Sequence, residues 1–406
     1  MKPVRLSGGE RLPHARLWAA VGSTTVGVLP VFLFGALAAL VRDDLQFSQS
    51  RIGLATAAFF LAAAVLSVPG GWLAERLGAV RTAAVAVGLV GCSLLGIAVF
   101  ARSWAQLVPL LALAGAANAF LQPATNAMLA GAIPRRRQGL VFGIKQAAVP
   151  LATTVAGIAL PVLGLTLGWR GAFGVAAALA LPMLVVLALL RDGRAGASPR
   201  TRASLRGSRD LVVLALVAAL GAGAGNAMGA FYVDSAIEGG SAAGVAGLFL
   251  AVGSGTGIFA RVAWGWWTDH RQIARLPVVG ILLLVGAVGF GLIAVRPSPL
   301  LLLLATIVAY AAGWGWNGLL IAAVIDAHPD APAAATGVTQ AGVYGGAVVV
   351  PPLFGLLAEA MSYAVAWAVA AGLVGVAGLL ALVAARWYTP SRREHRELPA
   401  TPVGSR

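Results

Sequence analysis

The sequence predicts an all-α polytopic membrane protein with twelve transmembrane helices, arranged as two bundles of six. Three observations carry this prediction. Only 11% of the 406 residues are charged and 59% are hydrophobic, whereas a soluble domain of average composition has about 25% charged residues. Apolar runs long enough to span a bilayer recur along the chain, separated by short charged segments. The two halves of the chain also resemble each other at a fixed spacing.

The basic N-terminal segment 1–16 is followed by an apolar run from about residue 17 to 41. This run is longer than the roughly 7–15 residues of a signal-peptide core, so we expect it to remain as the first span. Charged residues divide the rest of the chain into further runs, each able to cross a hydrocarbon core of about 30 Å. The twelve predicted spans are 17–41, 52–74, 82–101, 105–133, 139–167, 172–190, 211–235, 243–267, 277–295, 300–326, 337–359 and 364–385.

The distribution of lysine and arginine predicts the orientation. By these boundaries, segments on the side of the N-terminus hold 22 of the 29 basic residues, five lie opposite and two lie within spans. Because basic residues accumulate in cytoplasmic loops, we expect both termini to be cytoplasmic, in a cell membrane. Segment 327–336, which has no lysine or arginine, is the exception. The net charge of +15 then reflects topology, since no soluble domain remains to bind nucleic acid.

The basic segment 191–210 divides the chain into an N-terminal bundle, 17–190, and a C-terminal bundle, 211–385, followed by a tail, 386–406. Residues in separate helices match between the halves at one offset of 194 positions. Polar residues are among the matches, so chance repetition of glycine and alanine does not account for them. The matched pairs are Gly71 and Gly265, Trp72 and Trp266, Glu75 and Asp269, Arg81 and Arg275, Gly143 and Gly337, Gln146 and Gln340, and Ala147 and Ala341.

Two of the matched segments carry a family resemblance. GGWLAERLGAVR (70–81), between predicted spans two and three, resembles the signature of the major facilitator superfamily, broadly G-x-L-a-D-r-x-G-r-[KR]. GWWTDHRQIAR (265–275) resembles its copy in the second half. The segment departs from this signature by having Glu75 for the usual aspartate and Val80 between Ala79 and Arg81, and both changes keep the charge pattern. The resemblance implies two six-helix bundles around a central cavity, working as a monomer by alternating access; parallel repeats of this kind occur in secondary transporters.

Charged residues at the predicted cytoplasmic ends of both halves are candidates for a gate. Carboxylates and guanidinium groups at helix ends can pair across the halves, and the nearby glycines permit close helix approach. The alternative is that these charges only mark the membrane boundary, which applies to Arg271 and Arg275 in particular. The candidate gating residues are Glu75, Arg76, Arg81, Asp269, Arg271 and Arg275.

Two basic residues lie within predicted spans. Lys145, the only lysine besides Lys2, lies seven residues into span five, roughly 10 Å from its cytoplasmic end at about 1.5 Å per residue. Arg261 lies eight residues before Asp269, at a comparable depth in span eight. A cation at the centre of a span costs about 2.5–3.5 kcal/mol on insertion scales, and none of the fourteen acidic residues is predicted deep in a span. We therefore expect the substrate to supply the anion.

Each cation also has a structural alternative. The Lys145 ammonium could reach the cytoplasmic headgroups along its butyl stem, although the predicted depth is near the limit of that reach. Arg261 opens the pattern R-x-x-x-G-x-x-[ST]-D (261–269), which is common among superfamily members of varied substrate and favours a helix-packing role. In members that move monocarboxylates, an arginine at the matching position binds the carboxylate.

The string GIKQAAVP (143–150) is similar to one in the cyanate- and nitrate-related branch of the superfamily. The sequence therefore favours a secondary active transporter that moves a small anion or organic acid. The alternative is an efflux pump for neutral or lipophilic compounds, which the aromatic residues of span ten favour. Drug/proton antiporters carry G-x-x-x-G-P-x-x-G-G in span five, whereas AAVPLATTVAG (147–157) keeps Pro150 but lacks the glycine before it and the pair after it.

Polar and aromatic side chains recur at helical spacing on predicted spans four and ten. Residues three to four apart share one face of a helix. The resemblance implies that spans one, four, seven and ten line the cavity, so both stripes are candidates for substrate contact. The stripes are Asn118, Gln122 and Asn126 on span four, and Tyr310, Trp314 and Asn317 on span ten.

Other polar residues would join the same lining. Asn226 lies on span seven and Thr24 or Thr25 would contribute from span one, while the repeat-related Gln146 and Gln340 would flank the site from opposite halves. The alternative for each amide is an interhelical hydrogen bond, worth roughly 0.6 kcal/mol in a membrane.

We predict no cofactor and no enzymatic activity. Cys92 is a single cysteine and the four histidines show no metal-ligand spacing; a nucleophile or acid–base pair is likewise not evident. The predicted partners are a small anionic substrate, the lipid bilayer, and protons or a counter-anion. Proton coupling would have to use Asp234, Glu359 or Lys145, and exchange of one anion for another is the simpler alternative.

Overall fold

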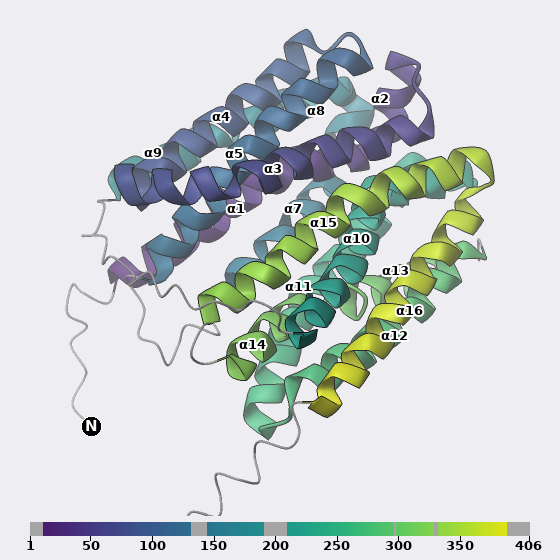
Figure 1. The fold of residues 1–406 in the computed structure, drawn as a ribbon. Coiled ribbons are helices and arrows are strands. Elements are labelled where there is room, and N and C mark those ends of the chain that lie inside the picture. The colour runs from purple at the N-terminus through teal and green to yellow at the C-terminus, as the bar shows by residue number, and fades with distance from the viewer. Residues whose placement is uncertain (1–10, 131–143, 191–208, 296–297, 329–331, 388–406) are drawn as a thin grey trace, which may run out of the picture.

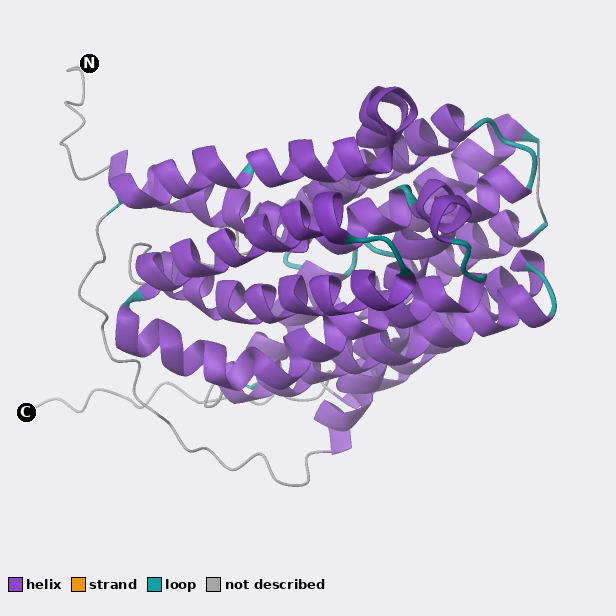
Figure 2. Cartoon of the chain, turned by 90° about the horizontal axis from the view of Figure 1, so that it is seen from above, coloured by secondary structure: helices purple, strands orange, loops and turns teal. Residues whose placement is uncertain are grey.

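The computed structural model describes residues 11–130, 144–190, 209–295, 298–328 and 332–387, and the regular structure in these ranges is helical throughout (Figures 1 and 2). Ten helices in the described ranges are long and apolar enough to cross a membrane, and two shorter apolar helices accompany them. The predicted all-helical membrane architecture is therefore confirmed. The number of twelve crossings and the side on which the termini lie stay predictions.

The first half follows the predicted spans closely, because apolar residues fill each run and polar turns separate them. Predicted span one is divided at Leu37 into a long helix and a short one. The helices are α1 (Arg11–Ala36), α2 (Ala38–Leu45), α3 (Gln49–Leu77), α4 (Ala79–Phe100), α5 (Trp104–Ala130), α7 (Ala148–Ala159), the π-helix η2 (Leu160–Gly164), α8 (Leu165–Ala178) and α9 (Ala180–Leu189).

The boundary between predicted spans five and six falls at a glycine. Residues 144–189 form an almost continuous helical stretch of 46 residues, which at about 1.5 Å per residue is roughly 69 Å and more than twice the thickness of a bilayer core. Gly168 interrupts it with φ 72° and ψ 168°, a conformation that glycine adopts readily because it has no Cβ. The glycine therefore lets the two spans turn back on each other.

The second half contains the remaining helices. They are α10 (Arg209–Glu238), α11 (Ala243–Arg271), α12 (Arg275–Ala294), α13 (Pro299–Ala311), α14 (Asn317–Ala327), α15 (Pro332–Ala360) and α16 (Tyr363–Trp387). In Figure 1 the purple-to-blue helices of the first half form one bundle, and the teal-to-yellow helices of the second half form another beside it.

Predicted span ten is not one continuous helix, although the prediction of a stripe formed by Tyr310, Trp314 and Asn317 assumed that it is. α13 ends at Ala311 and α14 begins at Asn317, and the turn between them has the sequence AGWGW (312–316). Two glycines within five residues favour such a break. Tyr310 and Asn317 therefore lie on different helices, and the prediction of one uninterrupted stripe is wrong.

The halves meet most closely where glycines face the partner backbone. We call the end of the helices with turns 46–48, 101–103 and 239–242 the outer end, and the end with Gly78 and Gln272 the inner end. A Cβ on Gly53 of α3 would lie 2.3 Å from the carbonyl oxygen of Pro351 of α15, and one on Gly157 of α7 would lie 2.7 Å from that of Gly247 of α11. Helices without intervening side chains pack at short distance, so these contacts hold the halves together toward the outer end.

Several predictions concern residues outside the described ranges. They are the tail 1–10, the basic cluster 135–137, Gly143 of the repeat, most of the basic linker 191–210 and the tail from 388 onward.

Candidate substrate site

Lys145 is buried and donates hydrogen bonds to side-chain amides of α5. Its side chain is 1% exposed, and its ammonium Nζ donates to Gln122 Oε1 at 2.5 Å and to Asn126 Oδ1 at 2.9 Å. Gln122 Nε2 in turn donates to Asn118 Oδ1 at 3.3 Å. The polar stripe predicted on span four is thus one face of α5, and it faces the buried lysine. The ammonium group bonds toward the bundle interior, in contrast to the snorkelling alternative.

The hydrogen-bond partners of Lys145 among the described residues are neutral. Both are side-chain amide oxygens, and no carboxylate of the described ranges bonds to the ammonium. Amides satisfy two of the three N–H donors without cancelling the charge. In its ammonium form, Lys145 therefore gives the site a positive charge with one N–H donor left over.

Arg261 joins the two halves. On α11, its Nη1 donates to the backbone carbonyl oxygen of Gln146 in the first half at 2.7 Å, and its Nη2 donates to that of Trp314 at 3.0 Å. The Trp314 carbonyl lies in the break between α13 and α14. A carbonyl freed from its helix is costly in a membrane interior unless it is hydrogen-bonded. The guanidinium group donates a hydrogen bond to that carbonyl. Its other acceptor is the carbonyl of Gln146, the residue that follows Lys145 in the sequence.

Aromatic residues of both halves pack beside the break. The rings of Tyr310 and Trp314 stack with centroids 5.6 Å apart, and Phe32 of α1 meets Trp314 edge-on at 5.7 Å. The Tyr310 hydroxyl is buried and has no hydrogen-bond partner among the described residues, as is also true of the Thr24 hydroxyl. Buried polar groups of this kind normally have partners, so these two hydroxyls are available to a ligand.

The remaining candidates have less specific surroundings. Asn226 is buried and donates to the Ala222 carbonyl of its own helix at 2.8 Å. Thr25 donates to the Val21 carbonyl at 2.9 Å, and Gln146, Gln340 and Asn317 are half-buried.

The predicted gating residues are charged groups at the inner ends of their helices. In this conformation Asp269 pairs within its own half, with Arg275 Nη2 at 2.7 Å, and Arg275 Nη1 also bonds Asp326. Glu75, Arg76 and Arg271 are exposed, as is Arg81. The structure thus brings Asp269 and Arg275 together but gives no Glu75 contact across the halves among the described residues.

Contacts across the halves that involve an acidic side chain are found instead at the outer end. Arg42 Nη2 of α2 contacts Asp234 Oδ1 of α10 at 3.1 Å, and the Tyr363 hydroxyl of α16 donates to Asp234 Oδ2. Gln49 Nε2 donates to Glu238 Oε2 at 2.7 Å. Asp234 lies at the end of predicted span seven (211–235), and the sequence offered no signal that Arg42 would be its partner. Since Arg42 and Asp234 are 192 positions apart, only the tertiary fold reveals the pair.

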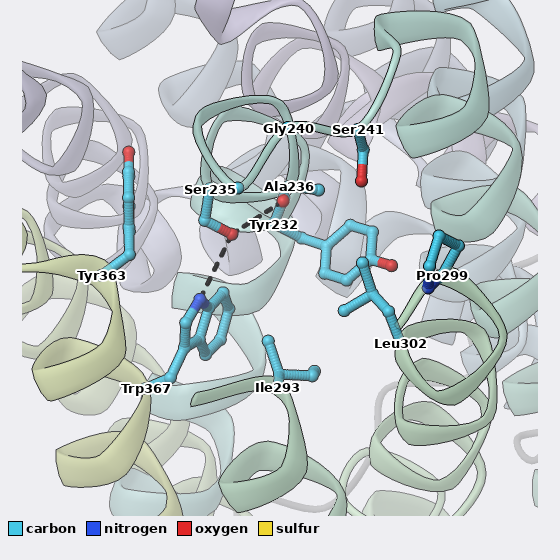
Figure 3. Close-up of a pocket in the computed structure, with 11 residues that line it drawn as sticks. Tyr232, Ser235, Ala236, Gly240, Ser241, Ile293, Pro299, Leu302, Tyr363 and Trp367 are labelled. Atoms are coloured by element: carbon cyan, nitrogen blue, oxygen red, sulfur yellow. Dashed lines mark hydrogen bonds between the residues drawn. The ribbon is translucent and has the colours of Figure 1, made fainter. Parts of the chain in front are cut away.

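A cavity of about 130 Å³ lies at the outer end of the second half (Figure 3). Its lining mixes aromatic and hydroxyl side chains, including Tyr232, Ser235, Ser241, Tyr363 and Trp367. Trp367 Nε1 donates to Ser235 Oγ at 3.2 Å and Ser235 Oγ donates to the Tyr232 carbonyl at 2.8 Å. In Figure 3 the Tyr363 hydroxyl points away from the other lining side chains. No group of three or more metal-ligating side chains occurs in the described ranges.

Known structures resemble this architecture along nearly its whole length. A bacterial homologue of the human lysosomal transporter Spinster, inward-facing and unoccupied, has a TM-score of 0.75 at 17% identity, over 93% of this chain and 98% of that one. Its inward-facing, occupied form gives 0.70 at 17% identity, over 93% and 96%. The D323A mutant of the nucleoside transporter NupG gives 0.73 at 15% identity, over 90% and 99%. These likenesses establish the fold.

One curated relative matches part of the chain. It is the tetracenomycin C resistance and export protein of Streptomyces glaucescens, which is 27% identical over 194 residues. The match spans 46% of this chain and 36% of that protein, so it covers about a third of the relative's length.

The family model for the Major Facilitator Superfamily matches residues 20–341, which is well over half of the chain. The same residues form the helices that carry Lys145, Arg261 and the amide stripe, and the solved structures that resemble the fold are transporters. The chain therefore belongs to the Major Facilitator Superfamily, and its long apolar helices make it a multi-pass membrane protein.

Proposed function

We propose that this transporter moves a small anion or organic acid by alternating access, with Lys145 and Arg261 as its counter-charges. The observation that carries the proposal is the surroundings of Lys145. A buried ammonium group held by two neutral amide oxygens keeps its positive charge uncompensated. Intramembrane cations are expensive and usually functional, and an anionic substrate would supply the missing charge.

The donor arrangement supports the same class of substrate. The Lys145 ammonium has one N–H donor beyond its two amide contacts, and the Arg261 guanidinium has three beyond its two carbonyl contacts. A carboxylate or a small inorganic anion accepts several such donors at once. The Tyr310 hydroxyl, buried without a partner, would add a neutral donor. The likeness of GIKQAAVP to the cyanate- and nitrate-related branch points to the same class.

The experiment is a ligand screen by thermal stability with purified full-length protein. Cyanate, nitrate, short carboxylates, aromatic acids and lipophilic cations are each added to the wild type and to Lys145→Gln. A ligand that binds only the folded state raises the melting temperature by mass action. We expect one class of anion to stabilise the wild type and to lose that effect in Lys145→Gln.

Arg386→Gln is the matched control, since it removes a cation that is exposed in the last turn of α16. It should keep the anion response of the wild type. If cations or neutral compounds stabilise the wild type and Lys145→Gln equally while anions stabilise neither, the anion proposal is wrong and Lys145 has a structural role.

A second candidate is efflux of a neutral or lipophilic compound. Two observations favour it: the partial similarity to a tetracenomycin C resistance and export protein, and the packing of Phe32, Tyr310 and Trp314 beside the break of span ten. An aromatic compound would stack on such rings. In that case Trp314→Ala would abolish the stabilisation by the compound and Lys145→Gln would preserve it.

The twelve crossings, the cytoplasmic termini, a cell-membrane location and a monomeric state complete the proposal. The close backbone contacts at Gly53 and Gly157 support a conformation closed at the outer end. The gate proposed at the inner end would then pair Glu75 and Asp269 with basic residues of the opposite half in the other conformation.

A further inference from the structure

A buried carboxylate links the halves at the outer end. Asp234, near the end of α10, is 1% exposed, whereas its partner Arg42 on α2 is 31% exposed. The two carboxylate oxygens have different partners: Oδ1 contacts the Arg42 guanidinium at 3.1 Å, and Oδ2 accepts from the Tyr363 hydroxyl. Arg42 belongs to the first half and Asp234 and Tyr363 to the second, so the ion pair spans the interface between them.

Two further acidic residues of the second half contact the first half nearby, in a different manner. Glu238 accepts from the Gln49 side-chain amide at 2.7 Å, and Glu359 accepts from the Ser50 backbone N–H at 2.9 Å. These donors are neutral and the contacts are exposed. A buried ion pair loses far more when one partner is neutralised than an exposed hydrogen bond does. Asp234 is therefore the acid whose charge matters most for holding the outer end closed.

We propose that Asp234 is the proton-binding site of this transporter, and that its protonation releases the closure between the halves at the outer end. The inference rests on the proposed secondary transport and names its coupling ion. One proton from outer water binds Asp234 Oδ1, the oxygen that faces the partly exposed Arg42. The carboxyl group becomes neutral, Arg42 keeps its charge and turns to water, and Tyr363 continues to donate to Oδ2. Loss of the proton restores the pair.

Polar and charged groups of several helices lie around Asp234. The Arg42 guanidinium from α2 and the Tyr363 hydroxyl from α16 both contact its carboxylate, and Glu238, which carries the same charge, lies on the next turn of α10. On α3 and α15, the charged neighbours are Arg51 and Glu359, which lie close to each other. Among the described residues, Arg42 is the only one of these groups that forms an ion pair with Asp234. Replacing Arg42 should therefore weaken the closure at the outer end more than replacing any of the others.

The test follows the distance between the halves in the full-length chain in lipid nanodiscs, without substrate. With Cys92 replaced by serine, spin labels are placed at Arg102 and Met361, which are exposed in outer turns of different halves. Double electron–electron resonance is recorded between about pH 8 and about pH 5. We expect a short distance at high pH and a growing population of longer distances as the pH falls.

The variants identify the group responsible. Asp234→Asn should show the longer distances at every pH, because its amide cannot pair with Arg42. Arg42→Gln should likewise show the longer distances at every pH, because it removes the other partner of the ion pair. Tyr363→Phe should move the midpoint of opening upward, and provides a milder change should Asp234→Asn fold poorly. Glu359→Gln is the matched control and should leave the midpoint in place.

The proposal is overturned if the wild-type distances do not depend on pH, or if the response survives in Asp234→Asn or is lost in Glu359→Gln. Its failure is distinguishable from failure of the anion proposal, since the distance measurement needs no substrate and the ligand screen needs no change of pH. An anion that stabilises the protein without any pH-dependent opening would retain the substrate class and exclude Asp234 as the coupling site.

Discussion

At the scale of single residues, we expect the burial of Lys145 to lower the free energy of unfolding of the protein. Burying its ammonium at this depth costs about 2.5–3.5 kcal/mol, while two amide hydrogen bonds return about 0.6 kcal/mol each. We therefore predict that Lys145→Met, which has a similar volume, makes the ligand-free protein more stable by about 1–2 kcal/mol. The measurement is reversible unfolding in mixed micelles, with Lys145→Arg as the control that keeps the charge. A less stable Lys145→Met protein would show that the lysine is a structural residue.

Arg261 carries two roles that one substitution can separate. Arg261→Lys keeps the charge but cannot bridge the carbonyl oxygens of Gln146 and Trp314, because a lysine ammonium is a point charge and not a planar fork. We predict a loss of stability of about 1–3 kcal/mol, the usual consequence of leaving a buried acceptor unpaired, with the anion response partly retained. Arg261→Gln should lose both. Thermal unfolding with and without the stabilising anion measures the two effects, and an intact anion response in Arg261→Gln would assign Arg261 to packing alone.

The residues of the candidate site could be identified from the sequence to different extents. The spacing of Asn118, Gln122 and Asn126 gave a polar helix face, and the isolated charge marked Lys145, because few residue types are tolerated in a membrane span. That the lysine and the amides face each other depends on the packing of α5 against the segment before α7. A one-dimensional pattern cannot show this.

At the scale of helices, hydropathy predicted the helix positions well because the bilayer requires long apolar segments. It failed inside span ten, since the residues of the AGWGW turn are apolar or small and raise no polar signal. The break is stabilised by tertiary contacts that the sequence does not display: Arg261 bonds the Trp314 carbonyl, and Trp316 Nε1 donates to the Gly313 carbonyl at 2.8 Å.

The close packing of α3 against α15 leads to a prediction about the distance between the two halves. Gly53→Ala places a methyl group where it would lie 2.3 Å from the Pro351 carbonyl oxygen, and a backbone atom cannot move aside as a flexible side chain would. The two helices must separate at the outer end, so we predict more of the longer distances between labels at positions 102 and 361. Gly71→Ala on the same helix is the control, because nothing lies within 4 Å of that position. Equal distance distributions for the two variants would exclude this contact as part of the outer closure.

At the scale of the whole molecule, the predicted orientation in the membrane rests on the 22 basic residues that the predicted spans place on one side, against five on the other. Because this bias is large, we predict that a cysteine at Met361, in an outer turn, reacts with a membrane-impermeant maleimide in intact cells. A cysteine at Arg271, at the inner end, should react only after the membrane is permeabilised. Both are placed in a Cys92→Ser background, and the reverse pattern would invert the proposed topology.

The number of crossings depends on α13 and α14. With 13 and 11 residues, they are about 20 Å and about 16 Å long, and each is too short to cross a core of about 30 Å. End to end, residues 299–327 are long enough, so we predict that the two helices form one interrupted span and that the chain crosses twelve times. Cysteines at Val295 and Asp326, on either side of the pair, should then react from opposite sides of the membrane. Arg275 keeps its partner Asp269 in the second variant. Labelling of both positions from one side would instead make the AGWGW turn the tip of a re-entrant hairpin, with eleven crossings and termini on opposite sides.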